Sequence, residues 1–161
     1  MVPADVEELE DGSPEKLAVE NARRKAAGVA LEVPDAVVLG VDTVVAVGER
    51  IYGKPADEGS AAETLRALSD RSHVVTSGLC LMTQDHRRTA AVSTTVSFRP
   101  LDEALIDWYL QGGEWRGRAG GYAIQGRGAA LVERIEGDYL NVVGLPLAAL
   151  LELVPALLYG S

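Results

Sequence analysis

A chain of 161 residues, 47% of them hydrophobic, is long enough for one domain with a substantial core. Its formal net charge of −9 argues against nonspecific nucleic-acid binding, which needs a basic surface. An acidic protein can still bind a nucleotide if a metal ion and local cations offset the phosphates. The single cysteine, Cys80, excludes a disulfide framework within this chain, and the acidic first residues differ from a secretory leader. We therefore expect a cytoplasmic protein.

The first half of the chain predicts helices and strands in alternation. Ser13-Pro14-Glu15 indicates a helix start, with a capping hydroxyl and a proline in the first turn, and this helix should run to about Val29. An apolar strand follows at about residues 37–47. Asp57 is then expected to cap a helix that continues through Leu68.

The second half is richer in β-branched residues and glycine, which predicts hairpins. The expected elements are, in chain order, a hairpin of strands 73–83 and 89–98, a short helix at 101–110, a glycine-dense segment at 117–128, strands at about 129–135 and 139–143, and a helix from near Pro146. The late apolar segment is too short to span a bilayer and contains Glu152 and Pro155. We expect a mixed-sheet α/β or α+β fold in a single domain over residues 1–161.

Asp42 is the most informative residue, because its carboxylate interrupts the apolar strand at 37–47. A buried strand tolerates a charge poorly unless an opposite charge pairs with it, so a cation should face Asp42. Lys54 follows one turn-like segment later. The sequence leaves a second interpretation open, in which Asp42 is a structural carboxylate that caps a turn through Thr43.

The segment from Gly48 to Pro55 nearly matches the phosphate-binding pattern GxxxxGK[ST]. Pro55, however, replaces the hydroxyl that holds magnesium and removes a backbone amide. The spacing favours the tip of an extended hairpin over an ATPase-type loop. Lys54, held between a glycine and a proline, remains a reasonable phosphate ligand, and the alternative is an exposed turn lysine.

Two further residues suggest a site when they are combined with Asp42. If Glu8 and Asp42 converge in space, their oxygens could hold a magnesium ion, although an acidic stretch is more often a solvated surface. Gln125 is a two-sided hydrogen-bonding group among glycines, which let a backbone approach a ligand closely. By default such a stretch is a flexible loop.

Taken together, these segments resemble the Maf family of nucleoside triphosphate pyrophosphatases from about Val2 to Leu153. Each segment alone is weak evidence for the family, but the order and spacing of all the segments together are specific to it. The matching segments are Asp5-Val6-Glu7-Glu8, Leu17-Ala18 with Lys25-Ala26, Gly40-Val41-Asp42-Thr43, Gly53-Lys54-Pro55, Leu68 to His73, Thr76-Ser77-Gly78, Ala119 to Gly126 and Gly137 to Pro146.

The resemblance implies an α/β fold with an elongated, twisted mixed sheet flanked by helices, related to the inosine triphosphate pyrophosphatases. It also implies hydrolysis of a nucleoside triphosphate to the monophosphate and pyrophosphate with a divalent cation, Mg or Mn. Asp42 matches the catalytic aspartate, Glu8 and Asp42 the metal site, and Lys25, Lys54 and Gln125 the positions that contact substrate. The pattern around Gln125 resembles the branch that acts on dTTP and UTP. A homodimer and a link to septum formation are further implications.

The chain differs from this family pattern at its N-terminus. Family members begin with a strand that runs into Ser-x-Ser-Pro-Arg-Arg, and this sequence starts after that segment. Missing arginines would remove bidentate contacts to phosphate that lysines replace poorly. Two explanations are open. The start codon is set too late or the chain is truncated, or this is a natural short form that binds nucleotide or protein as a noncatalytic regulator of cell division.

Overall fold

The structure, a computed structural model, describes residues 6–7, 9, 12–33 and 35–156. Its α-helices are α1 (Pro14–Ala30), α2 (Glu58–Leu68), α3 (Glu103–Gln111), α4 (Tyr139–Val143) and α5 (Leu147–Leu153). Its strands are β1 (Val38–Val47), β2 (Arg50–Tyr52), β3 (Ser72–Met82), β4 (Arg87–Phe98) and β5 (Val132–Glu136), and two 3₁₀ turns are η1 (Ala119–Gly121) and η2 (Arg127–Leu131).

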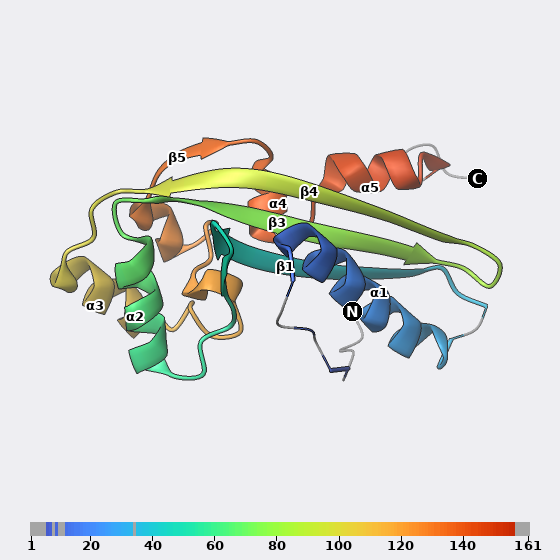
Figure 1. Ribbon diagram of the computed structural model, residues 1–161, viewed down its shortest axis with the longest axis horizontal. Helices are drawn as coiled ribbons and strands as arrows, with labels where there is room; N and C mark the ends of the chain where they lie inside the picture. The colour runs from blue at the N-terminus through green and yellow to red at the C-terminus, as the bar shows by residue number, and fades with distance from the viewer. Residues whose placement is uncertain (1–5, 8, 10–11, 34, 157–161) are drawn as a thin grey trace.

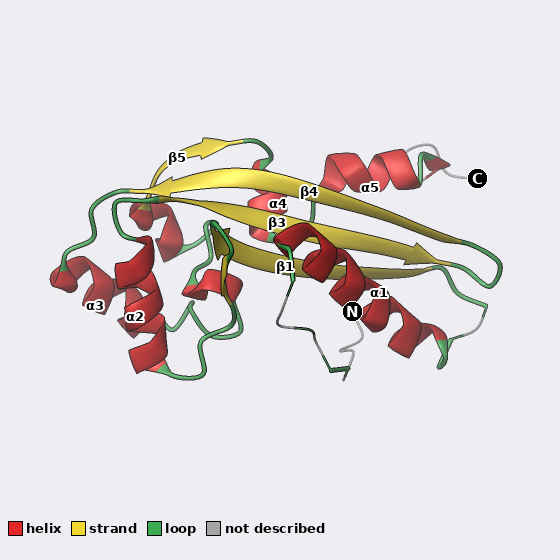
Figure 2. Ribbon diagram, viewed as in Figure 1, coloured by secondary structure: helices red, strands yellow, loops and turns green. Residues whose placement is uncertain are grey.

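The five strands form one elongated sheet in the order β2-β1-β3-β4-β5, with helices packed against it (Figure 1). This confirms the predicted fold class of a sheet flanked by helices. The sheet was expected to be mixed, whereas all pairings between the described strands are antiparallel. The long β3 and β4 strands run the length of the molecule in Figure 2.

Two hairpins account for most of the strand order. β3 and β4 form the predicted hairpin, in register from Ser72 opposite Ser97 to Met82 opposite Arg87. In the β1–β2 hairpin Val47 lies opposite Arg50, so the turn has only two residues. Its first residue, Gly48, has φ 58°, a left-handed conformation that glycine adopts without steric cost. The segment before Lys54 is therefore a hairpin and not a loop that opens a helix.

α1 lies unusually close to the sheet because glycines face it from β1 and β3. A Cβ added at Gly40 would lie 2.1 Å from the carbonyl oxygen of Ala22, and one added at Gly78 would lie 2.3 Å from that of Ala18. Neither strand can therefore carry a side chain at these positions without moving the helix. The close approach brings polar side chains of α1 within reach of β1.

Apolar side chains form clusters at the two ends of these strands. The large cluster joins α2, α3 and the 3₁₀ turns to the sheet, and includes Val45, Leu65, Val75, Phe98, Ile106 and Tyr109. Two small clusters lie under α1; one contains Ala22, Ala26, Val38 and Cys80, and the other contains Leu17, Ala18 and Val44. Figure 1 shows the same division, with α1 over one half of the sheet and α2 and α3 at the other end.

The structure corrects two expected strands. Residues 139–143 form the helix α4, because Asp138 accepts a hydrogen bond from the backbone N–H of Leu140 (2.8 Å) and Gly144 ends the helix with φ 121°. The strand expected at 129–135 is β5 only from Val132, because the preceding residues form the turn η2. No helix in the described part of the chain is long and apolar enough to cross a membrane.

Candidate active site

Asp42 lies in the middle of β1, on the face that α1 covers, and only 6% of it is exposed. Its Oδ1 accepts a hydrogen bond from Nζ of Lys25 at 2.5 Å, and its Oδ2 accepts one from Nδ2 of Asn21 at 3.3 Å. The prediction that a cation faces this buried carboxylate is confirmed, and the cation is Lys25. The alternative of a turn cap through Thr43 is wrong, because Asp42 is within a strand.

Asn21 connects the carboxylate to the N-terminal segment, a role that the sequence did not suggest. The backbone N–H of Leu9 donates to Oδ1 of Asn21 (2.7 Å), and Nδ2 of Asn21 donates to the carbonyl of Leu9 (3.1 Å). Asn21 and Lys25 are one helical turn apart and therefore share a face of α1. The sequence did carry one signal of this role, because two polar residues four positions apart interrupt the apolar stripe of the predicted helix.

Glu8, predicted as a metal ligand with Asp42, lies outside the described residues. Its neighbours on both sides are held against α1, because Arg24 donates to the carbonyl of Glu7 (3.0 Å) and Asn21 binds Leu9. Within the described part of the chain no group of three or more His, Cys, Asp or Glu residues could hold a metal ion. Of the two predicted metal ligands, Asp42 is the one that lies in the described part of the chain.

The structure brings the hairpin that carries Lys54 against the glycine-rich segment. The N–H of Gly120 donates to the carbonyl of Gly53 (3.1 Å), and a Cβ added at Gly121 would lie 3.2 Å from Pro55. Gly120 also packs on Val45 of β1, where an added Cβ would be 3.0 Å from the valine methyl groups. The residues on both sides of Lys54, Gly53 and Pro55, are therefore each in contact with the glycine-rich segment.

Gln125 is exposed and lines a cavity of about 340 Å³ beside the glycine-rich segment. The cavity is lined by Gly113, Glu114, Arg116, Arg118, Ala123, Gln125 and Gly126. Its arginines give it cationic groups beside the amide of Gln125. The acidic lining residue is engaged, because Oε2 of Glu114 accepts the backbone N–H of Arg127 at 2.7 Å. This arrangement suits a ligand that carries both negative charge and hydrogen-bonding groups.

A second polar network lies on the opposite face of the sheet, directly behind Asp42. The hydroxyl oxygens of Thr43 and Ser77 are 3.0 Å apart, and Ser77 donates to the carbonyl of Asn141 (3.3 Å). Asn141, fully buried, donates to the carbonyl of Val75 (3.0 Å) and to the hydroxyl of Thr94 (2.9 Å). The network attaches α4 to the sheet and supports β1 from behind.

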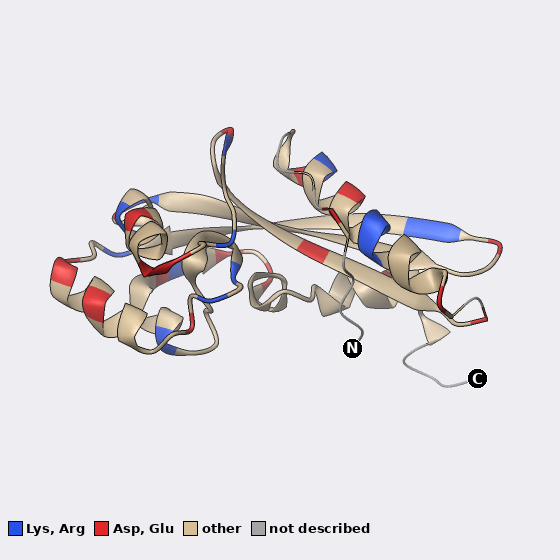
Figure 3. Cartoon of the chain, turned by 90° about the horizontal axis from the view of Figure 1, so that it is seen from below, with Lys and Arg blue, Asp and Glu red and all other residues tan. Residues whose placement is uncertain are grey.

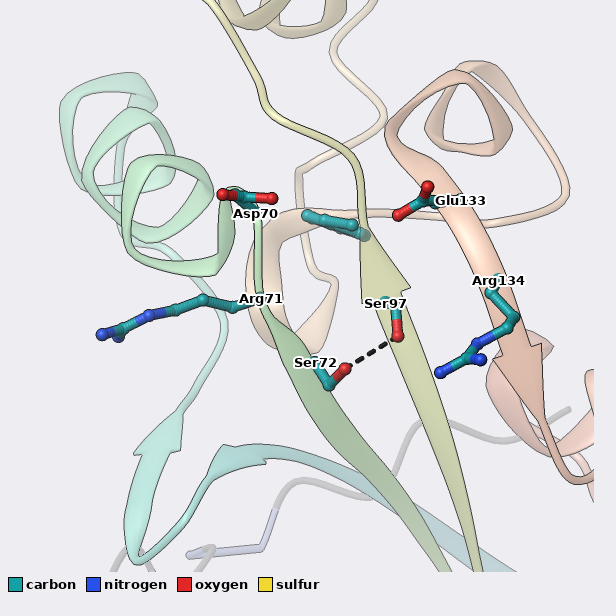
Figure 4. Close-up of a pocket in the computed structure, with 7 residues that line it drawn as sticks. Asp70, Arg71, Ser72, Ser97, Glu133 and Arg134 are labelled. Carbon is teal, nitrogen blue, oxygen red and sulfur yellow. Dashed lines mark hydrogen bonds between the residues drawn. The ribbon is translucent and has the colours of Figure 1, made fainter.

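A larger cavity, of about 480 Å³, lies at the N-terminal end of β3 (Figure 4). Its seven lining residues are Asp70, Arg71, Ser72, Ser97, Phe98, Glu133 and Arg134. Figure 4 shows the carboxylates of Asp70 and Glu133 on one side and the hydrogen-bonded Ser72 and Ser97 on the other. Acidic and basic groups are present in equal number, and none of the predicted site residues is among them. We therefore do not assign this cavity to the candidate site.

Acidic and basic residues pair with one another on α1. In the view of Figure 3 acidic and basic residues are interspersed along the chain, including α1. On α1 the guanidinium of Arg23 bonds both carboxylate oxygens of Glu20, at 2.7 and 2.8 Å, and this contact lowers the pKa of Glu20 to about 2. Among the described contacts of Asp42, the positive charge comes from Lys25.

His73, a β3 residue of the matched segments, is buried in an aromatic cluster. Burial lowers its pKa from 6.5 to about 4. The unfolded chain therefore binds the proton more readily than the folded chain between these two values. His73 stabilises the fold fully above about pH 6.5 and loses that contribution as the pH falls towards about 4.

We expect this histidine to account for about 2 kcal/mol of stability lost between about pH 7.5 and about pH 5. Urea denaturation at the two pH values measures the loss. In a His73→Gln variant the loss should be smaller by that amount, whereas His86→Gln, in an exposed turn, should leave it unchanged. Equal losses in the wild type and His73→Gln would contradict the assignment.

The chain is similar to known proteins over nearly its whole length. The chain matches the Maf-like protein family over residues 1–157. It is 42% identical to a dTTP/UTP pyrophosphatase of Pyrococcus furiosus over 154 residues, 94% of this chain and 81% of that protein. It is 44% identical to a dTTP/UTP pyrophosphatase of Deinococcus radiodurans, over 96% of this chain and 79% of that protein.

A third relative, a dTTP/UTP pyrophosphatase of Caulobacter vibrioides, is 42% identical over 98% of this chain and 83% of its own length. The similarity thus extends across every element that builds the candidate site, from α1 to the glycine-rich segment and α4. The relatives that the chain matches over most of their length are named as enzymes. By this similarity and by its match to the family, the chain belongs to the Maf-like protein family.

Proposed function

We propose that the chain hydrolyses nucleoside triphosphates to the monophosphate and pyrophosphate, with dTTP and UTP as preferred substrates, in a reaction that needs a divalent cation. The observation that carries the proposal is the buried carboxylate of Asp42, fixed by Lys25 and Asn21 on a rigid strand. The names of the relatives support the reaction and the preference for dTTP and UTP.

The carboxylate of Asp42 is suited to orient a water molecule for attack on phosphorus. Its two oxygens have about four lone pairs, of which the described hydrogen bonds from Lys25 and Asn21 occupy two. Because β1 is held by α1 on one face and by the network of Thr43 on the other, the carboxylate has a fixed direction. Fixed direction and free lone pairs are what a base or water-orienting group requires.

The donor set fits a magnesium or manganese ion. Mg²⁺ takes oxygen ligands, keeps several waters, and is held in many nucleotide enzymes by one or two carboxylates and the substrate phosphates. Asp42 supplies one such carboxylate, and we propose Glu8 as the second. When bound, the cation would supply positive charge to the phosphate oxygens that gain negative charge during attack.

The substrate contacts are proposed for Lys25, Lys54 and Gln125. Lys25 places an ammonium group beside Asp42, where it can also meet a phosphate oxygen. Lys54 follows the β1–β2 hairpin, between Gly53 and Pro55, which both contact the glycine-rich segment. Gln125 opens into the cationic cavity of about 340 Å³, where its amide can both donate to and accept from a base.

The test is incubation of the purified chain with dTTP, UTP, GTP and 7-methyl-GTP in the presence of Mg²⁺, with pyrophosphate and monophosphate measured together. Release of both products in equal amounts is expected, fastest with dTTP or UTP, and a chelator should abolish it. Release of orthophosphate alone would exclude cleavage at the α-phosphorus. Absence of pyrophosphate above the level of an Asp42→Asn variant would refute the proposal.

The resemblance to the family also carries proposals about location, assembly and cellular role. We propose that the protein acts in the cytoplasm as a homodimer and that it is linked to septum formation. The second candidate function is a noncatalytic regulator that binds nucleotide or protein. It would be favoured if calorimetry found nucleotide binding at wild-type strength in Asp42→Asn while neither protein released pyrophosphate.

A further inference from the structure

The glycine-rich segment enters the core just before Gln125 and leaves it there. Tyr122, Ala123 and Ile124 are 6%, 8% and 5% exposed, whereas Gln125 is exposed. The buried triplet of Tyr122, Ala123 and Ile124 therefore anchors the backbone from which the side chain of Gln125 extends. What fixes the triplet also fixes the direction in which the amide leaves the surface.

The first support is a hydrogen bond across the core from Tyr122 to β3. The phenol oxygen of Tyr122 lies 2.8 Å from Nε2 of His73. The two rings meet edge to face with centroids 5.4 Å apart, and Phe98 packs against both at 4.8 Å. Nδ1 of His73 has no partner among the described residues, so Nε2 is the ring atom that makes a directed contact. The aromatic packing fixes the rings, and the hydrogen bond fixes their relative rotation.

The second support comes from α3. The phenol oxygen of Tyr109 accepts the backbone N–H of Ala123 at 3.1 Å, and Tyr109 is fully buried. Behind this contact the chain folds back on itself, since a Cβ added at Gly128 would lie 2.3 Å from the carbonyl oxygen of Ala123. Two hydroxyls from different elements thus hold consecutive residues of the triplet.

Packing alone does not require these two hydroxyls. Phenylalanine has almost the same volume as tyrosine and would bury the same ring without a polar atom. Burial raises the pKa of Tyr109 to about 12 and also raises the pKa of Tyr122, so both phenols keep their protons at neutral pH. Each hydroxyl therefore acts as a hydrogen-bonding group that attaches the glycine-rich segment to a neighbouring element, Tyr122 to His73 of β3 and Tyr109 of α3 to Ala123.

We propose that Tyr122, through His73, and Tyr109, through Ala123, are positioning residues that set where the amide of Gln125 meets the substrate. The inference rests on the proposed function of Gln125 as a substrate contact, and it assigns to these core residues a role in substrate affinity. Neither tyrosine is expected to touch the substrate. Their effect should therefore disappear when the amide of Gln125 is removed.

The experiment is a double-mutant cycle of Tyr122→Phe and Gln125→Ala, measured as KM and kcat for dTTP and UTP. Tyr122→Phe is expected to raise KM about three- to tenfold, the effect of one net hydrogen bond, with kcat changed less than about twofold. In the Gln125→Ala background it should change KM no further. Tyr109→Phe should behave in the same way, and Tyr139→Phe, an exposed phenol on α4, should change nothing.

The results separate this inference from the proposed function. Unchanged KM in Tyr122→Phe, or a rise in KM that persists fully in the Gln125→Ala background, would overturn the inference while hydrolysis by the wild type stands. If the wild type hydrolyses nothing, the proposed function fails. The same double-mutant cycle is then measured by calorimetry as affinity for dTTP. Absence of binding would overturn both the proposed function and this inference. Should Tyr122→Phe fail to fold, His73→Phe removes the same hydrogen bond from the β3 side and should raise KM equally.

Discussion

Replacement of Asp42 by asparagine is expected to lower kcat/KM for dTTP and UTP by at least about 100-fold, the loss typical when a general base is removed. Asparagine preserves the shape of the side chain and can keep the contact with Asn21, but it cannot take a proton from water or balance the charge of Lys25. Initial rates of pyrophosphate release, with substrate varied around KM, measure the effect.

Asp85→Asn is the matched control, since this carboxylate is exposed in the turn between β3 and β4. It should retain the wild-type rate. A circular-dichroism melting curve for each variant separates lost catalysis from lost structure. If folded Asp42→Asn kept more than about a tenth of the wild-type kcat/KM, Asp42 would not be the base or water-orienting group.

Gly78→Ala is expected to destabilise the fold by about 3 kcal/mol, which lowers Tm by roughly 6–12 °C in a chain of this length. The new methyl group would lie 2.3 Å from backbone atoms of Ala18, so α1 has to move away from the sheet. Gly78 lies directly opposite Asp42 in the β1–β3 pairing. The displaced helix would carry Lys25 away from the carboxylate, and activity should fall together with stability.

Gly59→Ala is the control for this substitution. Gly59 is in the first turn of α2, where an added Cβ meets only Oδ1 of Asp57 at an ordinary 3.5 Å. Alanine is the better helix former, so the change should leave stability equal or raise it by up to about 1 kcal/mol. Thermal unfolding of the two variants under the same conditions makes the comparison. Equal Tm values for Gly78→Ala and the wild type would mean that α1 is not held at the sheet as described.

Much of the fold was predictable because its signals are local. The helix after Ser13, the apolar strand at 37–47 and the β3–β4 hairpin follow from capping residues, proline and β-branched runs within a few positions. The cap of α2 is as predicted, with the N–H of Ser60 donating to Asp57 at 2.7 Å. Ser13 also occupies its predicted cap position, but its side chain makes no capping hydrogen bond.

The segment at 139–143 misled the prediction, because its aromatic and β-branched residues favour a strand when taken alone. The signals that outweighed them were Asp138 before it and Gly144 after it, which cap the two ends of α4. Asn141 then fixes the helix to the sheet through long-range hydrogen bonds to β3 and β4 that no local pattern reports.

The candidate site was predictable in its residue types and less so in its contacts. A buried charge in a strand requires an opposite charge, which led directly from Asp42 to a cation. Which cation, and the part played by Asn21, depend on the close docking of α1 over Gly40 and Gly78. That docking is a tertiary property, and the sequence shows it only as two glycines in otherwise regular strands. The tyrosine supports of Gln125 were missed for the same reason.

The division of the apolar side chains between the two ends of the strands has a consequence for motion. The two clusters under α1 are small, and their buried members are three alanines, two valines, one leucine and Cys80, whereas the larger cluster at the other end contains aromatic rings and several leucines. Detaching α1 therefore exposes far less apolar surface than unfolding the other end, and needs less free energy. Local opening of this helix in the folded protein, on the timescale that amide hydrogen exchange reports, would separate Lys25 and Asn21 from Asp42 while the tyrosine-supported segment stayed in place. The half of the candidate site that carries Asp42 and the half that we propose to contact the base thus belong to units of different local stability.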